Sequence, residues 1–127
     1  MEREAEQFVE AFNLGDFDGI RRLLDDALVA HITSPEGEDV EMHGADEYVE
    51  SLRTMLTSAP TDYHVGLTQK PVAVGEDRIL LMLEIRASRG GKSLHNFSAQ
   101  LFRFGGPLIC EIQMTDAKPR ESSEFWA

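Results

Sequence analysis

The sequence predicts an α+β fold in which helices in the first half cover one side of a curved, antiparallel or mixed sheet. Apolar residues recur at helical spacing in the first half, and long strand-like runs separated by glycine-rich turns fill the second half. Helices segregated to one face of such a sheet are typical of this class. At 127 residues, the chain is expected to form one domain over residues 1–127.

Two short helices joined by a tight corner open the chain. The first carries apolar residues at i, i+3, i+4 and i+7, which are Ala5, Phe8, Val9 and Phe12. Gly15 suits the left-handed position that ends a helix, and Asp16 suits the N-cap of the next one. The second helix has its own apolar stripe, formed by Phe17, Ile20, Leu23 and Leu24. Asp25 and Asp26 are expected to end it.

A strand, a turn, a short return strand and a third helix are expected next. The strand covers 27–33, the turn 34–37 and the return strand 39–43. The third helix opens at Gly44, and Ala59–Pro60 is expected to stop it, because proline disfavours the α conformation of the preceding residue. Its buried face consists of Tyr48, Val49, Leu52, Met55 and Leu56.

Strands dominate the second half. Alternating residues begin at Tyr63, and Pro71 marks a bulge or an edge, because proline cannot donate to a ladder. The long strands are expected at 78–88, 93–104 and 108–114. The tail 116–127 is polar until Phe125–Trp126, and no element is expected there. A bulged sheet curls, and closing it with three helices would form a cone with an apolar pocket inside.

Charge and composition exclude several classes of protein. The net charge of −11 disfavours nucleic acid, and no Lys/Arg cluster would attract an anionic membrane. Cys110 is the single cysteine, so an intramolecular disulfide is excluded. No signal-peptide core follows the charged first residues, and the longest apolar run, 79–83, is too short to span a bilayer. We expect a cytoplasmic protein.

The segment from Glu6 to Ile20 (EQFVEAFNLGDFDGI) resembles the opening of ketosteroid isomerases and SnoaL-like proteins of the nuclear transport factor 2-like superfamily. The resemblance covers nearly the whole chain, and its further matches are Asp25–Ala27, His43–Gly44, Leu101–Phe104 and Ile109–Met114. It implies a cone-shaped, cystatin-like α+β fold with an internal pocket. It also implies a homodimer that pairs through the convex face of the sheet.

The same resemblance assigns catalytic roles to positions of this chain. The isomerase general base falls on His31, the oxyanion-binding tyrosine on Phe8, the second oxyanion donor on Gln100, and a supporting tyrosine near Leu52. All four residues differ from the isomerase pattern, so we do not expect steroid isomerisation.

His31 and Gln100 are the predicted catalytic residues. His31 shares a strand face with Val29 and Thr33, and the resemblance implies that this face lines the pocket. An imidazole titrates near neutral pH and accepts protons from carbon acids or water. The alternative is a buried histidine that hydrogen-bonds a neighbour and performs no chemistry. Gln100 would polarise a ligand carbonyl, or instead bond to His31 or a water molecule.

Large apolar residues form the predicted ligand-binding wall, and each is equally a candidate for plain core. They are Phe8, Phe12, Leu52, Met55, Phe102 and Met114. Trp126 is expected to be a lid over the pocket or a dimer contact rather than a merely exposed residue. The four histidines have no metal-ligand spacing, so neither a metal nor another cofactor is expected.

These observations predict a SnoaL-like enzyme of the isomerase, cyclase or dehydratase type, acting on a small, largely apolar molecule that bears a carbonyl or hydroxyl. Two alternatives stay open, because this fold hosts several classes of function. One is a binding module that holds a ligand without chemistry. The other is an association domain that uses the outer sheet face, where the apolar run 79–83 would lie beside Phe97, Ala99 and Leu101.

Overall fold

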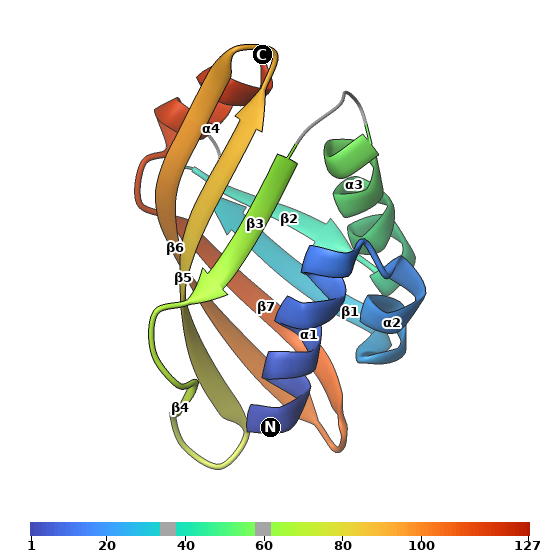
Figure 1. The fold of residues 1–127 in the computed structure, drawn as a ribbon. Coiled ribbons are helices and arrows are strands. Elements are labelled where there is room, and N and C mark those ends of the chain that lie inside the picture. The colour runs from blue at the N-terminus through green and yellow to red at the C-terminus, as the bar shows by residue number, and fades with distance from the viewer. Residues whose placement is uncertain (34–37, 58–61) are drawn as a thin grey trace.

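A curved sheet with helices on one face forms the frame of the protein (Figure 1). The computed structural model describes residues 1–33, 38–57 and 62–127. Its helices are Glu2–Leu14 (α1), Phe17–Arg22 (α2), Ala45–Thr57 (α3) and Pro119–Trp126 (α4). Its strands are Leu24–Thr33 (β1), Asp39–His43 (β2), Asp62–Leu67 (β3), Val72–Ala73 (β4), Arg78–Arg89 (β5), Lys92–Gly105 (β6) and Leu108–Asp116 (β7). The expected turn at 34–37 and helix stop at Ala59–Pro60 lie outside the described residues.

The corner between α1 and α2 follows the predicted chemistry. Gly15 adopts the left-handed conformation with φ 66°, and the Asp16 carboxylate accepts a hydrogen bond from the Gly19 N–H at 2.9 Å. The next boundary differs from the prediction, since α2 ends at Arg22 and β1 begins at Leu24. Leu24 pairs with Ile109 of β7, so the last long strand draws this segment into the sheet.

The sheet is mixed, with strand order β2-β1-β7-β6-β5-β3 and with β4 paired to β5. β1 and β7 run parallel, and every other pair is antiparallel. The register shifts between Leu24 and Val29 of β1 and between Arg103 and Phe104 of β6. Such irregularities increase the local twist and bend a strand. The predicted curved α+β architecture is confirmed.

The core lies between the concave face of the sheet and helices α1 to α3. Side chains alternate across a strand, so Leu81, Leu83 and Ile85 of β5 point inward while their neighbours face out. Phe102 of β6 is fully buried and meets Phe8 of α1 edge to face, with 5.0 Å between ring centroids. This contact seats α1 on the middle of the sheet (Figure 1).

Helix α4 is an element that the sequence did not predict. It lies at the end of the sheet where β5 turns into β6 (Figure 1). The Arg89 guanidinium at this turn donates to the Phe125 carbonyl at 3.0 Å, and Phe125 is buried. Within the described residues, no helix has the length and apolar character needed to cross a bilayer.

Candidate functional site

A cavity of about 250 Å³ lies between α1, α3 and the concave face of the sheet. Its wall is mostly apolar, as is usual for small-molecule sites. The apolar members are Phe8, Val9, Phe12, Ile32, Met42, Leu52, Met55, Val65, Leu83, Ile85 and Met114. The fold therefore leaves a hollow where the sequence predicted one.

Asn13 fixes one side of this cavity. Its Nδ2 donates to the Val65 carbonyl at 2.7 Å, and its Oδ1 accepts from the Val65 N–H at 2.9 Å. The amide thus pairs with the backbone of β3 as a neighbouring strand would. It ties the end of α1 to the free edge of the sheet and holds Val65 in the cavity wall.

Gln100 is the polar residue of the wall whose bonding is incomplete. Its Oε1 is buried, and no hydrogen-bond donor for it is found among the described residues. A buried amide oxygen without a partner costs about 1–3 kcal/mol. Ser98, also on the inward face of β6, lines the same cavity. A residue of the cavity wall therefore carries a buried hydrogen-bond acceptor that no described residue satisfies.

Two phenols complete the polar part of the wall. Burial raises the pKa of Tyr48, and burial together with the negative charge of Asp116 raises the pKa of Tyr63 to about 12. The Ser51 hydroxyl already has a partner within the helix, since it donates to the Tyr48 carbonyl at 2.6 Å. Among the described wall residues there is no Asp, Glu, His, Lys, Arg or Cys. This part of the wall is uncharged at neutral pH.

His31 is not in the cavity, so its predicted position is wrong. It pairs with Glu41 of β2 and Gln113 of β7, while the next residue, Ile32, lines the cavity. The His31 Nδ1–H donates to Asp39 at 3.0 Å on the outer face of the sheet, and this bond raises the pKa of His31. The alternative of a buried, hydrogen-bonded histidine is met in the hydrogen bond to Asp39 but not in burial, since the His31 side chain is 22% exposed.

The sequence of β1 itself indicates which of its residues point into the fold. The even positions 28, 30 and 32 are Leu, Ala and Ile, whereas the odd positions 29, 31 and 33 include His and Thr. A strand with one buried face keeps the apolar set inside. The same reasoning would have found Ser98, which shares parity with Gln100, and Tyr48, which lies one helical turn before Leu52.

The structure brings most of the predicted wall residues together. The cavity is lined by Phe8, Phe12, Leu52, Met55 and Met114, and also by the predicted polar residue Gln100. Phe102 is instead part of the solid core behind Phe8, fully buried and away from the cavity surface. The contribution of the wall residues to ligand binding stays a prediction.

Trp126 is close to the cavity but does not line it. Its ring centroid is 5.7 Å from that of Tyr63, which does line the cavity, and 5.0 Å from that of Phe125. The Arg89 guanidinium lies over the ring at 5.9 Å. Trp126 therefore backs the cavity wall through Tyr63, while its predicted role as a lid or dimer contact stays a prediction.

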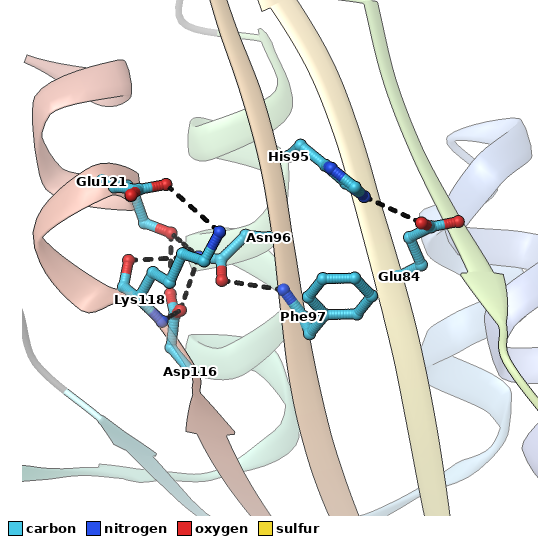
Figure 2. A network of polar contacts seen from close by, with 8 residues as sticks. Glu84, His95, Asn96, Phe97, Asp116, Lys118 and Glu121 are labelled. Carbon is cyan, nitrogen blue, oxygen red and sulfur yellow. Dashed lines mark hydrogen bonds and ion pairs between the residues drawn. The ribbon is translucent and has the colours of Figure 1, made fainter.

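A buried polar network holds α4, and with it Trp126, in place (Figure 2). Asn96 of β6 is fully buried, and its Nδ2 lies 2.6 Å from the Asp116 carboxylate and 2.9 Å from the Ser122 hydroxyl. Ser122 donates to the other Asp116 oxygen at 2.7 Å, and the Lys118 N–H donates to Asp116 at 2.9 Å. The network joins β6 and β7 to the first turns of α4.

Comparisons with known proteins agree with this architecture. The chain is similar to an LEH-like epoxide hydrolase from M. tuberculosis (19% identity, TM-score 0.77, 97% of this chain and 86% of that one). It is also similar to a cystatin-like-fold protein of unknown function from Xanthomonas campestris (17% identity, TM-score 0.84, 98% of this chain and 96% of that one). A third match is a protein from Jannaschia sp. CCS1 assigned as a SnoaL-like polyketide cyclase (10% identity, TM-score 0.80, 98% of this chain and 90% of that one).

At these identities the solved structures establish the fold, and the family follows from the sequence itself. No curated protein matches the chain. The family model described as the SnoaL-like domain matches residues 5–112, which include most of α1, every element from α2 to β6 and the first half of β7. This protein therefore belongs to the SnoaL-like family.

Proposed function

We propose that the internal cavity binds a small, uncharged, largely apolar molecule that donates one hydrogen bond to Gln100. The observation that carries this proposal is the buried Gln100 Oε1, which has no partner among the described residues although Gln100 lines a mostly apolar hollow. A ligand hydroxyl or N–H would satisfy this oxygen. A carbonyl ligand would be accommodated if the amide turned to present its N–H₂ group.

The volume limits the ligand to a compact molecule. An apolar cavity of about 150 Å³ accepts benzene, and this cavity is about 250 Å³. One or two fused rings would therefore fill it. The flexible Met42, Met55 and Met114 side chains adapt to irregular shapes.

Binding is favoured over proton transfer as the main role of the cavity. General acid–base catalysis needs a group that titrates near the working pH. The titratable side chains on the described wall are Tyr48 and Tyr63, whose pKa values burial raises still further above neutrality. His31, the predicted base, lies on the opposite face of the sheet.

A second candidate is turnover of the isomerase or cyclase type, which membership of the SnoaL-like family supports. Two of the structural relatives are described as an epoxide hydrolase and a polyketide cyclase. The observation that favours it here is that Tyr48 and Gln100 both offer polar groups to one apolar cavity. Hydrogen-bond donors in such surroundings stabilise developing negative charge on a carbonyl oxygen.

Matched ligands test the binding proposal. Calorimetric titration should show that the wild-type protein binds 2-indanol about three- to tenfold more tightly than indane, because the alcohol meets Gln100. In Gln100→Met this order should reverse, since the hydroxyl would be buried without a partner. Gln113→Met, on the exposed outer face of β7, is the matched control and should behave as wild type.

Equal affinities for both ligands in the wild-type protein would contradict the role of Gln100. Absence of binding by the wild-type protein and by Gln100→Met would contradict the cavity as a ligand site. Incubation of bound carbonyl compounds, followed by mass spectrometry and NMR, distinguishes the second candidate. A new product formed by the wild-type protein but not by Tyr48→Phe would assign chemistry to the cavity.

We also propose that two copies pair through the outer face of the sheet. Met82 and Phe97 are apolar but 38% and 39% exposed there. They border a shallow hollow of about 170 Å³ with Thr68, Ala99, Thr115 and Ala117. Exposed apolar patches of this kind commonly mark sites of association.

A further inference from the structure

A cluster of histidine and carboxylate groups lies outside the cavity, where β2 pairs with β1. Asp39, Glu41 and His43 occupy alternate positions of β2, so all three project from one face. The register places His31 of β1 directly opposite Glu41. Four potential metal ligands thus come from two neighbouring strands of the outer face.

The distances within this cluster suit a coordinated ion. The His31 Nδ1 lies 3.0 Å from the Asp39 Oδ2 and 3.5 Å from the Glu41 Oε1. One ligand atom from each of these three residues lies within 4.8 Å of the other two. Ligands at about 2.0–2.2 Å from a transition metal are themselves roughly 3.0–3.6 Å apart. The two pairs that include His31 therefore have the spacing of neighbouring corners of a coordination sphere, and the Asp39 and Glu41 oxygens lie within 4.8 Å of each other.

The surroundings of His31 resemble those of a metal-bound imidazole. Metal-binding histidines usually direct their second nitrogen toward a carboxylate or carbonyl, which fixes the orientation of the ring. Here the Nε2 faces the Glu111 carboxylate at 3.9 Å, and Arg103 holds Glu111 from the other side at 3.6 Å. The His31 side chain is 22% exposed, so it is held by its neighbours yet reachable from water.

The donor set indicates which class of ion would bind. The grouped ligand atoms are one imidazole and two carboxylates, and His43 lies beside them with its Nε2 3.1 Å from the other oxygen of Glu41. Magnesium and calcium prefer oxygen ligands alone. Mixed imidazole and carboxylate sites suit zinc and related first-row ions. The net charge of −11 also attracts cations to the surface.

We propose that His31, Asp39 and Glu41, with His43 beside them, bind a divalent transition-metal ion such as Zn²⁺ on the outer face of the sheet. The ion would replace the proton on the His31 Nδ1 and join the edge strand β2 to β1. The spacing of histidines along the sequence does not predict this site, because its residues come together only through the register of two strands. The proposal is independent of the cavity and of any ligand bound there.

Calorimetric titration of the untagged, EDTA-treated full chain with ZnCl₂ tests the proposal. We expect one Zn²⁺ per chain, and a loss of affinity of more than tenfold in both His31→Gln and Asp39→Asn. The control is His95→Gln, because His95 also lies on the outer face and bonds a single carboxylate, Glu84, at 2.8 Å (Figure 2). This control should bind Zn²⁺ as the wild type does.

Titration with Co²⁺ followed by absorption spectroscopy supplies a second readout, which does not depend on the heat of binding. Co²⁺ bound to imidazole and carboxylate should give visible d–d absorption without the near-ultraviolet band that a Cys110 thiolate would add. No saturable binding by the wild-type protein would overturn the proposal, as would equal affinities in the wild type and His31→Gln. Circular dichroism of each variant, compared with the wild type, separates loss of the ligand from loss of the fold.

Discussion

Both tyrosines of the chain, Tyr48 and Tyr63, line the cavity, so tyrosine spectroscopy reports on this site alone. Tyr48 is 3% exposed, and Tyr63 packs between Phe12 and Trp126. A buried phenol is harder to ionise, because the phenolate loses its hydration. The pKa values of the two phenols therefore report how far water is excluded from the cavity.

We predict that the folded protein shows no tyrosine ionisation near pH 10 when absorbance at 295 nm is followed. The pKa of Tyr63 is about 12 in the fold and about 10 in an unfolded chain, so the unfolded state loses its phenol proton first as pH rises. The free energy of unfolding should consequently fall between pH 10 and 12, by about 1 kcal/mol at pH 11 from Tyr63 alone.

Urea denaturation at pH 9 and pH 11 measures this change. Tyr63→Phe should weaken the pH dependence and leave the contribution of Tyr48. A native titration midpoint close to pH 10 for both phenols would show that water reaches them freely, and would contradict a dry cavity.

At the residue scale, the sequence predicted which side of a helix or strand faces the interior better than it predicted the function of single residues. Helical and strand spacing placed Phe8, Phe12, Leu52, Met55 and Met114 on inward faces, and the resemblance singled out Gln100; all six line the cavity, whereas Phe102 does not. The resemblance implies that His31 faces the pocket, whereas the apolar residues at even positions of β1 predict that His31 faces outward, as observed. The unpartnered state of the Gln100 oxygen depends on every neighbour in three dimensions, and no local pattern could reveal it.

At the scale of elements, α4 depends on tertiary contacts more than on its own sequence. Its residues PRESSEFW offer Phe125 as the buried apolar anchor, so a helical stripe is hardly visible. Stability comes instead from Asn96 and Asp116, which hold Ser122 and the start of the helix. Short helices are marginal in water without such packing, so the sequence of the tail alone does not predict this one.

We predict that Asn96→Ala lowers the free energy of unfolding by about 1–3 kcal/mol, because it removes buried hydrogen bonds and leaves their partners unsatisfied. Emission from Trp126 should also shift to longer wavelength as α4 loosens. Urea denaturation followed by fluorescence measures both effects. The neighbouring exposed residue supplies the control, and His95→Ala should change stability by less than about 0.5 kcal/mol. Equal effects of the two substitutions would contradict the anchoring role of the network.

At the scale of the whole molecule, the two faces of the sheet have different chemistry. The concave face holds the cavity, while the convex face carries exposed Met82 and Phe97 together with the His31 cluster. The curved fold was predictable, because segregated helices and long strands admit few arrangements. The parallel pairing of β1 with β7 was not, because it joins segments about 80 residues apart and no local signal reports it.

We predict that the double substitution Met82→Glu/Phe97→Glu converts a dimer to a monomer. Charges on the exposed apolar patch would face each other across the interface without compensation. Sedimentation equilibrium measures the mass, which is 14.2 kDa for one chain. Val74→Glu, a similarly exposed valine beside β4, is the control and should stay dimeric. A wild-type protein that sediments as a monomer at micromolar concentration would refute pairing through this face.

The strand order also constrains how the chain reaches its native state during synthesis. Among the described strands, β1 pairs with β2 and β7, so its second edge stays open until β7, which ends at Asp116, has left the ribosome. Until then the β2-β1 pair, which α3 contacts, is not joined to the strands β3 and β5 that α1 contacts. Nascent chains shorter than this should be captured by chaperones, and compaction should occur late and in one step rather than from the N-terminus onward.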